Sequence, residues 1–310
     1  MSMGTEQWKA ALGERLLTNE PLARHTTFGI GGPAEYYVVV HAAAELRDVV
    51  RLAWEQHIPY LLLGSGANVL VSDQGVRGLV IHNRASALEF SLQDDGKTGW
   101  LQAESGALLR HAARQAVERG LAGLEWAVDV PGTVGGAVVG NAGAYGGYVS
   151  DSLRGAQVLT PDQGEQWWPS QQLGLIYRSS VLKKGRKAAE FASVILWATF
   201  VLHVEDTAVL QAKAVEYSKR RGESQPQGMS AGSVFKRTDQ YPAGFLIENV
   251  GLKGARVGGA VVSPQHANFI INTGTATARD VRELIELIRT TVYARFKIML
   301  ELEIELVGEW

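Results

Sequence analysis

The sequence contains no cysteine among its 310 residues. This absence excludes disulfide bonds, thiolate metal sites and cysteine nucleophiles, and it suits a reducing compartment. The start of the chain also lacks a basic segment followed by an apolar one, so we predict no secretory signal. From these two absences we expect a cytoplasmic protein.

The sequence also has little excess of either charge and no long apolar run. Its formal net charge is -2 and its pI is about 6.4, which gives no general basic surface for nucleic acid. No apolar run is long enough to span a bilayer. With 46% hydrophobic and 20% charged residues, the chain has the composition of a globular protein of two or three modest domains.

Common metal and nucleotide motifs are missing or fail in context. The seven histidines are scattered without metal-ligand spacing, so we expect no metal site and interpret His266 as structural. The pattern Gly29-x-Gly31-x-x-Ala34 resembles a dinucleotide fingerprint, but a strand rather than a helix is predicted after it. Gly96-Lys97-Thr98 resembles the end of a P-loop, yet Ser91 stands where that motif needs glycine.

The most distinctive stretch runs from Pro131 to Gly147, where seven of 17 residues are glycine and none is charged. Such a segment cannot neutralise a ligand with side chains, but its backbone N–H groups can approach a diphosphate closely. A flexible linker or a tight structural turn is the alternative, although Val134, Val138 and Tyr145 give the stretch apolar anchors. Further glycine-rich loops lie at 29–32 and 64–68. An elongated cofactor that contains a diphosphate could be held by the backbone amides of all three segments.

Strands and helices alternate without regular βαβ units, which favours the α+β class. Periodicity predicts helices over 43–56, 107–119 and 279–295, and hairpins near 88–103 and 157–168. The last predicted strand, 298–307, places Glu301, Glu303 and Glu305 on one face. We expect three regions, 1–82, 83–205 and 206–310.

Polar residues gather in the second half of the chain. Arg178 lies in Tyr177-Arg178-Ser179-Ser180, and further cations flank a run of small residues around Ser233. These cations could bind a phosphorylated or carboxylated substrate, or they could belong to a capped turn with helix-end charges. They are Arg220, Arg221, Lys236 and Arg237.

Taken together these segments resemble the MurB family, UDP-N-acetylenolpyruvoylglucosamine reductase, in order and spacing from about residue 20 onward. The resemblance is carried by the motifs at 26–32, 64–68, 131–137, 141–146, 177–180, 230–236 and 300–303. It implies a two-domain FAD-binding module of the PCMH/vanillyl-alcohol-oxidase type, which the C-terminal strand joins, followed by a third α+β domain for substrate. It assigns FAD binding to Gly64, Ser65, Gly66, Ala67, Asn68, Pro131, Gly132, Thr133, Gly135, Gly136 and Gly143.

The family reaction has two halves: NADPH reduces flavin N5, and N5 then delivers the hydride to C3 of the enolpyruvyl group of UDP-N-acetylglucosamine enolpyruvate. The resemblance implies that Ser233 donates the proton to C2, while Arg178 and Glu303 act at the adjacent carboxylate. Negative charge develops there and needs fixed positive partners. Tyr145, Arg221, Lys236 and Arg237 are the implied substrate contacts, and we expect a monomer making UDP-N-acetylmuramate for peptidoglycan synthesis.

Two other functions fit parts of the sequence. A flavin-dependent alcohol oxidase would keep the first two regions but gives no reason for Arg178, Ser233 and Glu303 to occur together. A catalytically silent nucleotide-sugar binding protein would bind substrate without flavin turnover. Flavin reoxidation by the enolpyruvyl substrate separates these alternatives.

Overall fold

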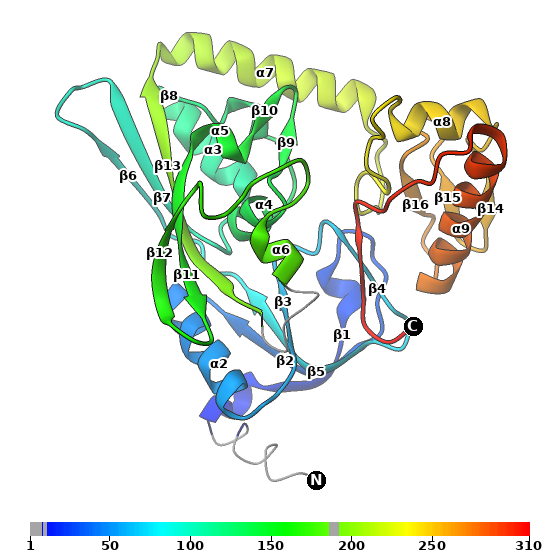
Figure 1. Cartoon of the computed structure of the whole chain (residues 1–310), viewed down its shortest axis with the longest axis horizontal. Coiled ribbons are helices and arrows are strands. Elements are labelled where there is room, and N and C mark those ends of the chain that lie inside the picture. The colour runs from blue at the N-terminus through cyan, green and yellow to red at the C-terminus, as the bar shows by residue number, and fades with distance from the viewer. Residues whose placement is uncertain (1–7, 9–10, 186–191) are drawn as a thin grey trace. The chain divides into compact units, whose positions relative to one another are not determined.

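A computed structural model describes residues 8, 11–185 and 192–310 (Figure 1). The chain divides into compact units, which we call unit 1 and unit 2. Unit 1 contains the residues up to Leu17 together with Tyr37–Ser65 and Leu79–Arg221. Unit 2 contains Thr18–Tyr36, Gly66–Gly78 and Gly222–Trp310. Both units mix helices and strands, so the predicted α+β class is confirmed.

An antiparallel sheet dominates unit 1 and is visible in green and cyan in Figure 1. Its strand order is β12 (Gly164–Pro169), β11 (Leu153–Thr160), β13 (Val194–Val204), β7 (Thr98–Glu104) and β6 (Leu88–Leu92), and β8 (Leu121–Ala122) also pairs with β13. The β6–β7 and β11–β12 hairpins confirm the turn-based predictions. Helix α3 (Leu109–Glu118) buries its apolar face in the core that this sheet shares with residues 124–139.

A strand-helix-strand unit is made of β2 (Pro33–Val40), α2 (Ala43–Glu55) and β3 (Tyr60–Leu63), and α2 confirms the helix predicted over 43–56. Helix α2 buries residues at the expected spacing, among them Leu46, Val49 and Val50. Strand β3 pairs in parallel with β5 (Val76–Asn83), and β1 (Leu17–Pro21) pairs with β2. Because β2 begins at Pro33, the Gly29–Ala34 pattern leads into a strand and is not a dinucleotide fingerprint.

The glycine-rich stretch is more regular than an extended loop. It contains helix α4 (Val134–Val139), which buries Val134, Val138 and Val139, and a small hairpin of β9 (Gly143–Ala144) and β10 (Gly147–Tyr148). Helix α5 (Val149–Ser152) follows directly. The apolar anchors seen in the sequence are therefore helix positions that attach the stretch to the core of unit 1.

Unit 2 is built around helix α9 (Ala278–Phe296), which packs against the strands β14 (Arg256–Val257) and β15 (Ala260–Val262) (Figure 1). Strand β16 (Ile270–Asn272) completes this antiparallel sheet beside β15. A capping box of Thr277 and Asp280 begins the helix. Helix α8 (Ala243–Asn249) packs on α9 and completes the core. The predicted long C-terminal helix is confirmed.

The C-terminal strand is shorter than predicted. Strand β17 (Glu305–Val307) pairs in parallel with β4 (Val69–Val71), whereas residues 298–304 contact the protein through an isolated bridge at Leu302 and single backbone hydrogen bonds. The segment changes partner from Phe235 to Asn68, and this change prevents one continuous strand. The prediction of a regular strand over 298–307 was wrong in length.

The remaining elements are short apart from α7, which lies at the unit boundary. They are α6 (Val181–Gly185), α7 (Thr207–Ser224) and the 3₁₀ turns η1 (Gly13–Arg15), η2 (Leu22–His25) and η3 (Glu125–Ala127). Among the described residues, no helix has both the length and the apolar character needed to cross a membrane. The division into regions 1–82, 83–205 and 206–310 stays a prediction.

Candidate active site

Two glycine-rich segments meet within unit 1. A Cβ atom at Gly64 would lie 2.5 Å from Oγ1 of Thr133 and 3.0 Å from its Cγ2. Thr133 is buried and caps α4 by accepting from the amide of Gly136 at 3.4 Å. Glycine at position 64 therefore lets the end of β3 approach the start of α4 more closely than any other residue could.

The same place holds a polar atom with no protein partner. The hydroxyl oxygen of Ser65 is buried and makes no hydrogen bond within the described residues. A buried hydroxyl normally finds a partner. Gly132, at a φ of +125°, has open space where a side chain would stand. A buried hydroxyl that lacks a partner and a backbone position with open space both fit a polar ligand held close to the backbone.

Other glycines of the stretch are required for packing. The amide of Gly135 donates to the carbonyl of Ser105 at 2.8 Å, and a Cβ there would lie 2.8 Å from the Ser105 side chain. A Cβ at Gly143 would lie 2.3 Å from the ring of Tyr148. Pro131 and Gly136 are exposed, on the rim of the segment. These contacts fix the shape of the backbone around Gly132 and Thr133.

Arg178 occupies a turn tied to the glycine-rich stretch. Ile176 and Ser179 bond to each other through both backbone groups, and Arg178 takes a left-handed φ of +53°. The buried Asn141 donates to the carbonyl of Ile176 at 3.2 Å, and Ser180 donates to that of Val139 at 2.7 Å. The arginine is half-buried and is held in place by residues on both sides of its turn.

Tyr145 stands in an aromatic and cationic cluster. Its ring stacks on Tyr217 of α7 at a centroid distance of 5.1 Å, and the guanidinium of Arg220 lies 5.3 Å from the Tyr145 ring centre. The side chain of Arg221 also hydrogen-bonds with Tyr145. Burial lowers the pKa of Arg221, while the charges of Tyr145 and Asp129 act in the opposite direction.

Asp129 links this cluster to the rest of unit 1. It accepts from Ser218 and pairs with Arg114. Burial alone would raise the pKa of Asp129, but the hydrogen bonds from Ser218 and Arg114 and the charges of Arg114 and Arg221 lower it overall. The carboxylate therefore stays ionised and holds the end of α7 in place.

Unit 2 contains the rest of the 64–68 loop. The carbonyl of Gly66 accepts from the amide of Thr27 at 3.2 Å, and the Thr27 hydroxyl donates to the carbonyl of Ser230 at 2.7 Å. Ala67 is half-buried. Asn68 donates through Nδ2 to the carbonyl of Glu303 at 3.1 Å and accepts from the amide of Glu305 at 2.9 Å. The loop is thereby joined to the segment that carries Glu303.

Ser233 and Glu303 lie on neighbouring extended segments of unit 2. The amide of Glu303 donates to the carbonyl of Val234 at 2.8 Å, and the amide of Lys236 donates to the carbonyl of Glu301 at 2.9 Å. Both Ser233 and Glu303 are half-buried. The structure therefore brings together the two segments that carry Ser233 and Glu303, which are far apart in the sequence.

The glutamates of this segment have different surroundings. Glu301 has a side chain that is 75% exposed and pairs with the ammonium of Lys236 at 3.1 Å, whereas Glu303 is half-buried. Arg237 is exposed. Of the two glutamates, Glu303 is the one suited to act on a bound group.

Comparisons with known proteins agree with these features. Residues 225–307 match the family model described as "UDP-N-acetylenolpyruvoylglucosamine reductase, C-terminal domain", and residues 34–168 match that described as "FAD binding domain". UDP-N-acetylenolpyruvoylglucosamine reductase of Chloroflexus aggregans is 41% identical over 299 residues, which cover 96% of this chain and 100% of that protein. The chain belongs to the UDP-N-acetylenolpyruvoylglucosamine reductase family.

Further members of this reductase family support the assignment. The protein of the same name from Caldicellulosiruptor bescii is 45% identical over 312 residues, covering 99% of this chain and 96% of its own. The crystal structure of the family reductase from Thermus caldophilus matches with a TM-score of 0.77 and 32% identity, covering 94% of this chain and 98% of that one. The resemblance and the expected FAD-binding module are confirmed.

The family cofactor fits the residues of unit 1. Gly64 and Thr133 form a close-packed cradle, the Ser65 hydroxyl needs a partner, and the site lies within the 34–168 segment that matches the FAD model. FAD supplies hydride transfer, and the reductases of this family are flavin-dependent oxidoreductases that use NADPH. Among the described residues no cluster could hold a metal ion, and His266 instead accepts from the amide of Asn268.

Some residues that shape the reductase site were missed in the sequence. Asn268 bonds to both backbone groups of Phe235, and Asp129 anchors the cluster around Tyr145. Asn268 carries a detectable signal, because it is a lone polar residue at the start of an apolar strand, and buried polar groups need partners. Asp129 gives no comparable signal, because its partners come from α3 and α7.

Proposed function

We propose that this protein catalyses the NADPH-dependent reduction of UDP-N-acetylglucosamine enolpyruvate to UDP-N-acetylmuramate through FAD, a step of peptidoglycan precursor synthesis. The observation that supports the proposal is the backbone bond between Glu303 and Val234, because it joins the segment of Glu303 to the residue after Ser233 within a chain of this reductase family. FAD held by unit 1 would supply the hydride chemistry that links NADPH to C3 of the enolpyruvyl group.

The chain's own residues hold the cofactor. Ser65 supplies a hydroxyl, and Gly132 and Thr133 offer backbone groups next to open space. Gly64, Gly135 and Gly143 keep the neighbouring backbone closely packed. The remaining assigned positions shape the two loops, and they are Gly66, Ala67, Asn68, Pro131 and Gly136. Uncharged loops of this kind bind a diphosphate through dipoles rather than salt bridges.

Ser233 gives a proton to C2 of the substrate after the hydride has been added. Hydride addition places negative charge on C2 and its carboxylate, and the permanent charge of the Arg178 guanidinium stabilises it until the proton arrives. Protonation then discharges C2 and leaves an ordinary carboxylate beside Arg178. Glu303 acts with Arg178 at this carboxylate. A serine is a weak acid, so nearby cations such as Lys236 must lower the cost of its alkoxide.

The cationic and aromatic residues contact the rest of the substrate. Tyr145 and Arg221 form one group, already linked by a hydrogen bond, and Lys236 and Arg237 form another. Lys236 exchanges its partner Glu301 for substrate in this scheme, which costs little because Glu301 is well exposed. A cytoplasmic location and a monomeric state belong to the same proposal.

Anaerobic flavin spectroscopy tests the function directly. The purified protein should be yellow, NADPH should bleach it, and UDP-N-acetylglucosamine enolpyruvate should restore the colour with formation of UDP-N-acetylmuramate. Reduction of the flavin by an alcohol and its reoxidation by oxygen, without a response to the enolpyruvyl substrate, would instead indicate an alcohol oxidase. Substrate binding to a colourless protein would indicate a nucleotide-sugar binding protein.

A further inference from the structure

The side chain of Asn268 forms a paired contact with the backbone of Phe235, two residues after Ser233. Its Oδ1 accepts from the Phe235 amide at 3.0 Å and its Nδ2 donates to the Phe235 carbonyl at 2.8 Å. A carboxamide carries one acceptor and donors side by side, as a peptide group does. Asn268 is 7% exposed, so water does not compete for these bonds.

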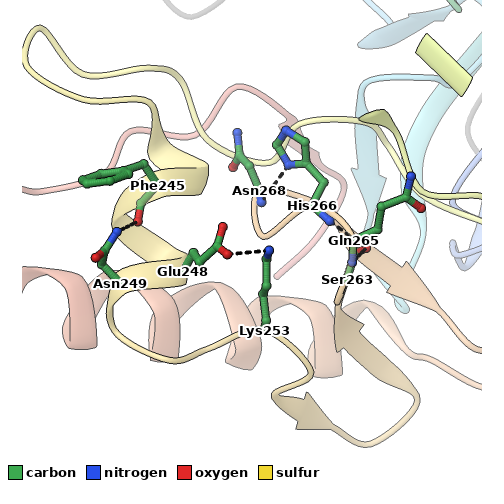
Figure 2. A network of polar contacts seen from close by, with 8 residues as sticks. All are labelled: Phe245, Glu248, Asn249, Lys253, Ser263, Gln265, His266 and Asn268. Atoms are coloured by element: carbon green, nitrogen blue, oxygen red, sulfur yellow. Dashed lines mark hydrogen bonds and ion pairs between the residues drawn. The ribbon is translucent and has the colours of Figure 1, made fainter. Parts of the chain in front are cut away.

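The backbone of Asn268 is fixed as well. Its carbonyl accepts from the amide of Val234 at 2.8 Å, and its amide donates to Nδ1 of His266 at 3.2 Å. Figure 2 shows His266 beside Asn268, with the Ser263 and Gln265 side chains at the other end of the same turn. Phe269, the next residue, forms a bridge with Ser233 itself. Asn268 is thus fixed by its own backbone contacts, and its side chain can fix the Ser233 segment in turn.

The opposite edge of that segment bears Glu303. Val234 accepts from Glu303, so the short run 233–236 lies between Asn268 on one side and residues 301–303 on the other. Gly232, at a φ of +76°, precedes the run and has no side chain to stabilise it. The hydrogen bonds of Asn268 therefore replace the neighbouring strand that this run lacks at Phe235.

We propose that Asn268 is a positioning residue for Ser233, which fixes the serine in register with Glu303 through the backbone of Val234 and Phe235. The inference rests on the proposed function, since it concerns the proton that Ser233 gives to the substrate. Loss of the side-chain amide leaves two buried peptide groups of Phe235 without partners. The segment then shifts, and a displacement of about 1 Å can slow a reaction by roughly 100-fold.

The test compares Asn268→Ala with Asn272→Ala in anaerobic stopped-flow measurements of both half-reactions. Asn272 is a matched control, because it is 5% exposed, lies on β16 and bonds through its side chain to Phe28, Gly274 and Ala276 rather than to the Ser233 segment. We expect Asn268→Ala to slow reoxidation by the enolpyruvyl substrate by roughly 10- to 100-fold and to leave reduction by NADPH within about twofold. Asn272→Ala should lower the melting temperature and leave both rates within about twofold.

A second variant keeps the test decisive if Asn268→Ala does not fold. In Asn268→Asp, a protonated carboxyl offers the same donor and acceptor pair as the amide, whereas a carboxylate can only accept. The ratio of the variant's reoxidation rate to that of the unmodified protein should therefore rise as the pH is lowered. A flat ratio, or equal slowing of reoxidation by the changes at 268 and 272, would overturn the positioning role.

The two proposals fail in different ways. An unmodified protein that NADPH reduces but the enolpyruvyl substrate does not reoxidise would end the proposed function. An unmodified protein that completes both half-reactions, together with an Asn268→Ala variant that slows neither or slows both equally, would end the positioning role alone.

Discussion

The amide of Glu303 donates to the carbonyl of Val234 across 2.8 Å, which fixes the residue that follows Ser233. This backbone bond joins the residue after the proposed proton donor to the residue that carries the proposed acidic group. Residues close to one another along these two segments can therefore have different roles.

Ser233→Ala should slow reoxidation by the enolpyruvyl substrate by roughly 10²- to 10⁴-fold, the usual contribution of a positioned proton donor. Reduction by NADPH should stay nearly unchanged, because that half-reaction needs no proton at C2. Single-turnover absorbance of the flavin measures both rates. Equal losses in the two halves would contradict the role of Ser233 as proton donor.

Glu303→Ala should produce the same selective loss, whereas Glu301→Ala should change both rates by less than about threefold. The difference follows from burial, since Glu301 is well exposed and its ion pair with Lys236 contributes little in water. Steady-state kcat and KM, measured beside the half-reactions, check this matched pair. A larger effect at 301 than at 303 would exchange the roles assigned to the two glutamates.

Gly64→Ala should weaken FAD binding, because the added methyl group would collide with Thr133 and displace the start of α4. Gly222→Ala is the control, since a Cβ there meets no atom within 4 Å and the residue lies in α7. The flavin-to-protein absorbance ratio after gel filtration measures retention of the cofactor. Full flavin content in Gly64→Ala would show that Thr133 can move at no cost.

His266 should make stability depend on pH. Burial lowers the pKa of His266 below its ordinary value of 6.5, with the charge of Lys253 acting in the same direction and that of Glu248 opposing it. Between the folded-state pKa and 6.5 the unfolded chain binds a proton that the folded protein does not. The free energy of unfolding should therefore fall as the pH is lowered through this window and level off below it.

Urea unfolding of the intact protein at a series of pH values checks the prediction. Fluorescence monitors the unfolding. The control is His266→Gln, which keeps an acceptor for the amide of Asn268 and cannot titrate. The difference in unfolding free energy between the two proteins should shrink or change sign as the pH falls. A pH-independent difference would mean that His266 keeps its ordinary pKa in the folded protein.

Asp73→Ala should reduce stability by about 1–2 kcal/mol, comparable to the loss of a helix-capping side chain, because Asp73 supports the first turn of α9 beside the N-cap Thr277. Both carboxylate oxygens of Asp73 accept from the first turn of α9, from Ala278 at 2.8 Å and Arg279 at 3.0 Å. Thermal unfolding measures the loss. Asp162→Ala, at the exposed β11–β12 turn, should be close to neutral.

Local patterns were sufficient for most of the fold. The helices around Leu46, Val117 and Ile285 follow apolar spacing, and the β6–β7 hairpin follows from Asp95 and Gly96, where the carboxylate accepts from the amides of Lys97 and Thr98. The strand at 298–307 was overestimated because alternation of apolar residues also occurs in a segment that changes partners. Periodicity reports which residues are buried, not which strand they pair with.

The site was predictable to a different degree. Glycine content and the family resemblance identified the loops and the residues Ser233 and Glu303, and the comparisons confirm the family. The bonding partners of Asn268, Asp129 and Asn141 could not be found in this way, because each side chain bonds to a segment distant in the sequence. Their roles depend on tertiary contacts that no local pattern encodes.

The pairing of β17 with β4 has a consequence for the order of events on the ribosome. Asn68 is translated early, yet the carbonyl and amide that complete its hydrogen bonds belong to residues near Glu303, 235 positions later. Unit 2 therefore cannot reach its native arrangement while the nascent chain is still growing through α9. If this loop binds flavin as proposed, it reaches its binding geometry only when the polypeptide is almost entirely synthesised.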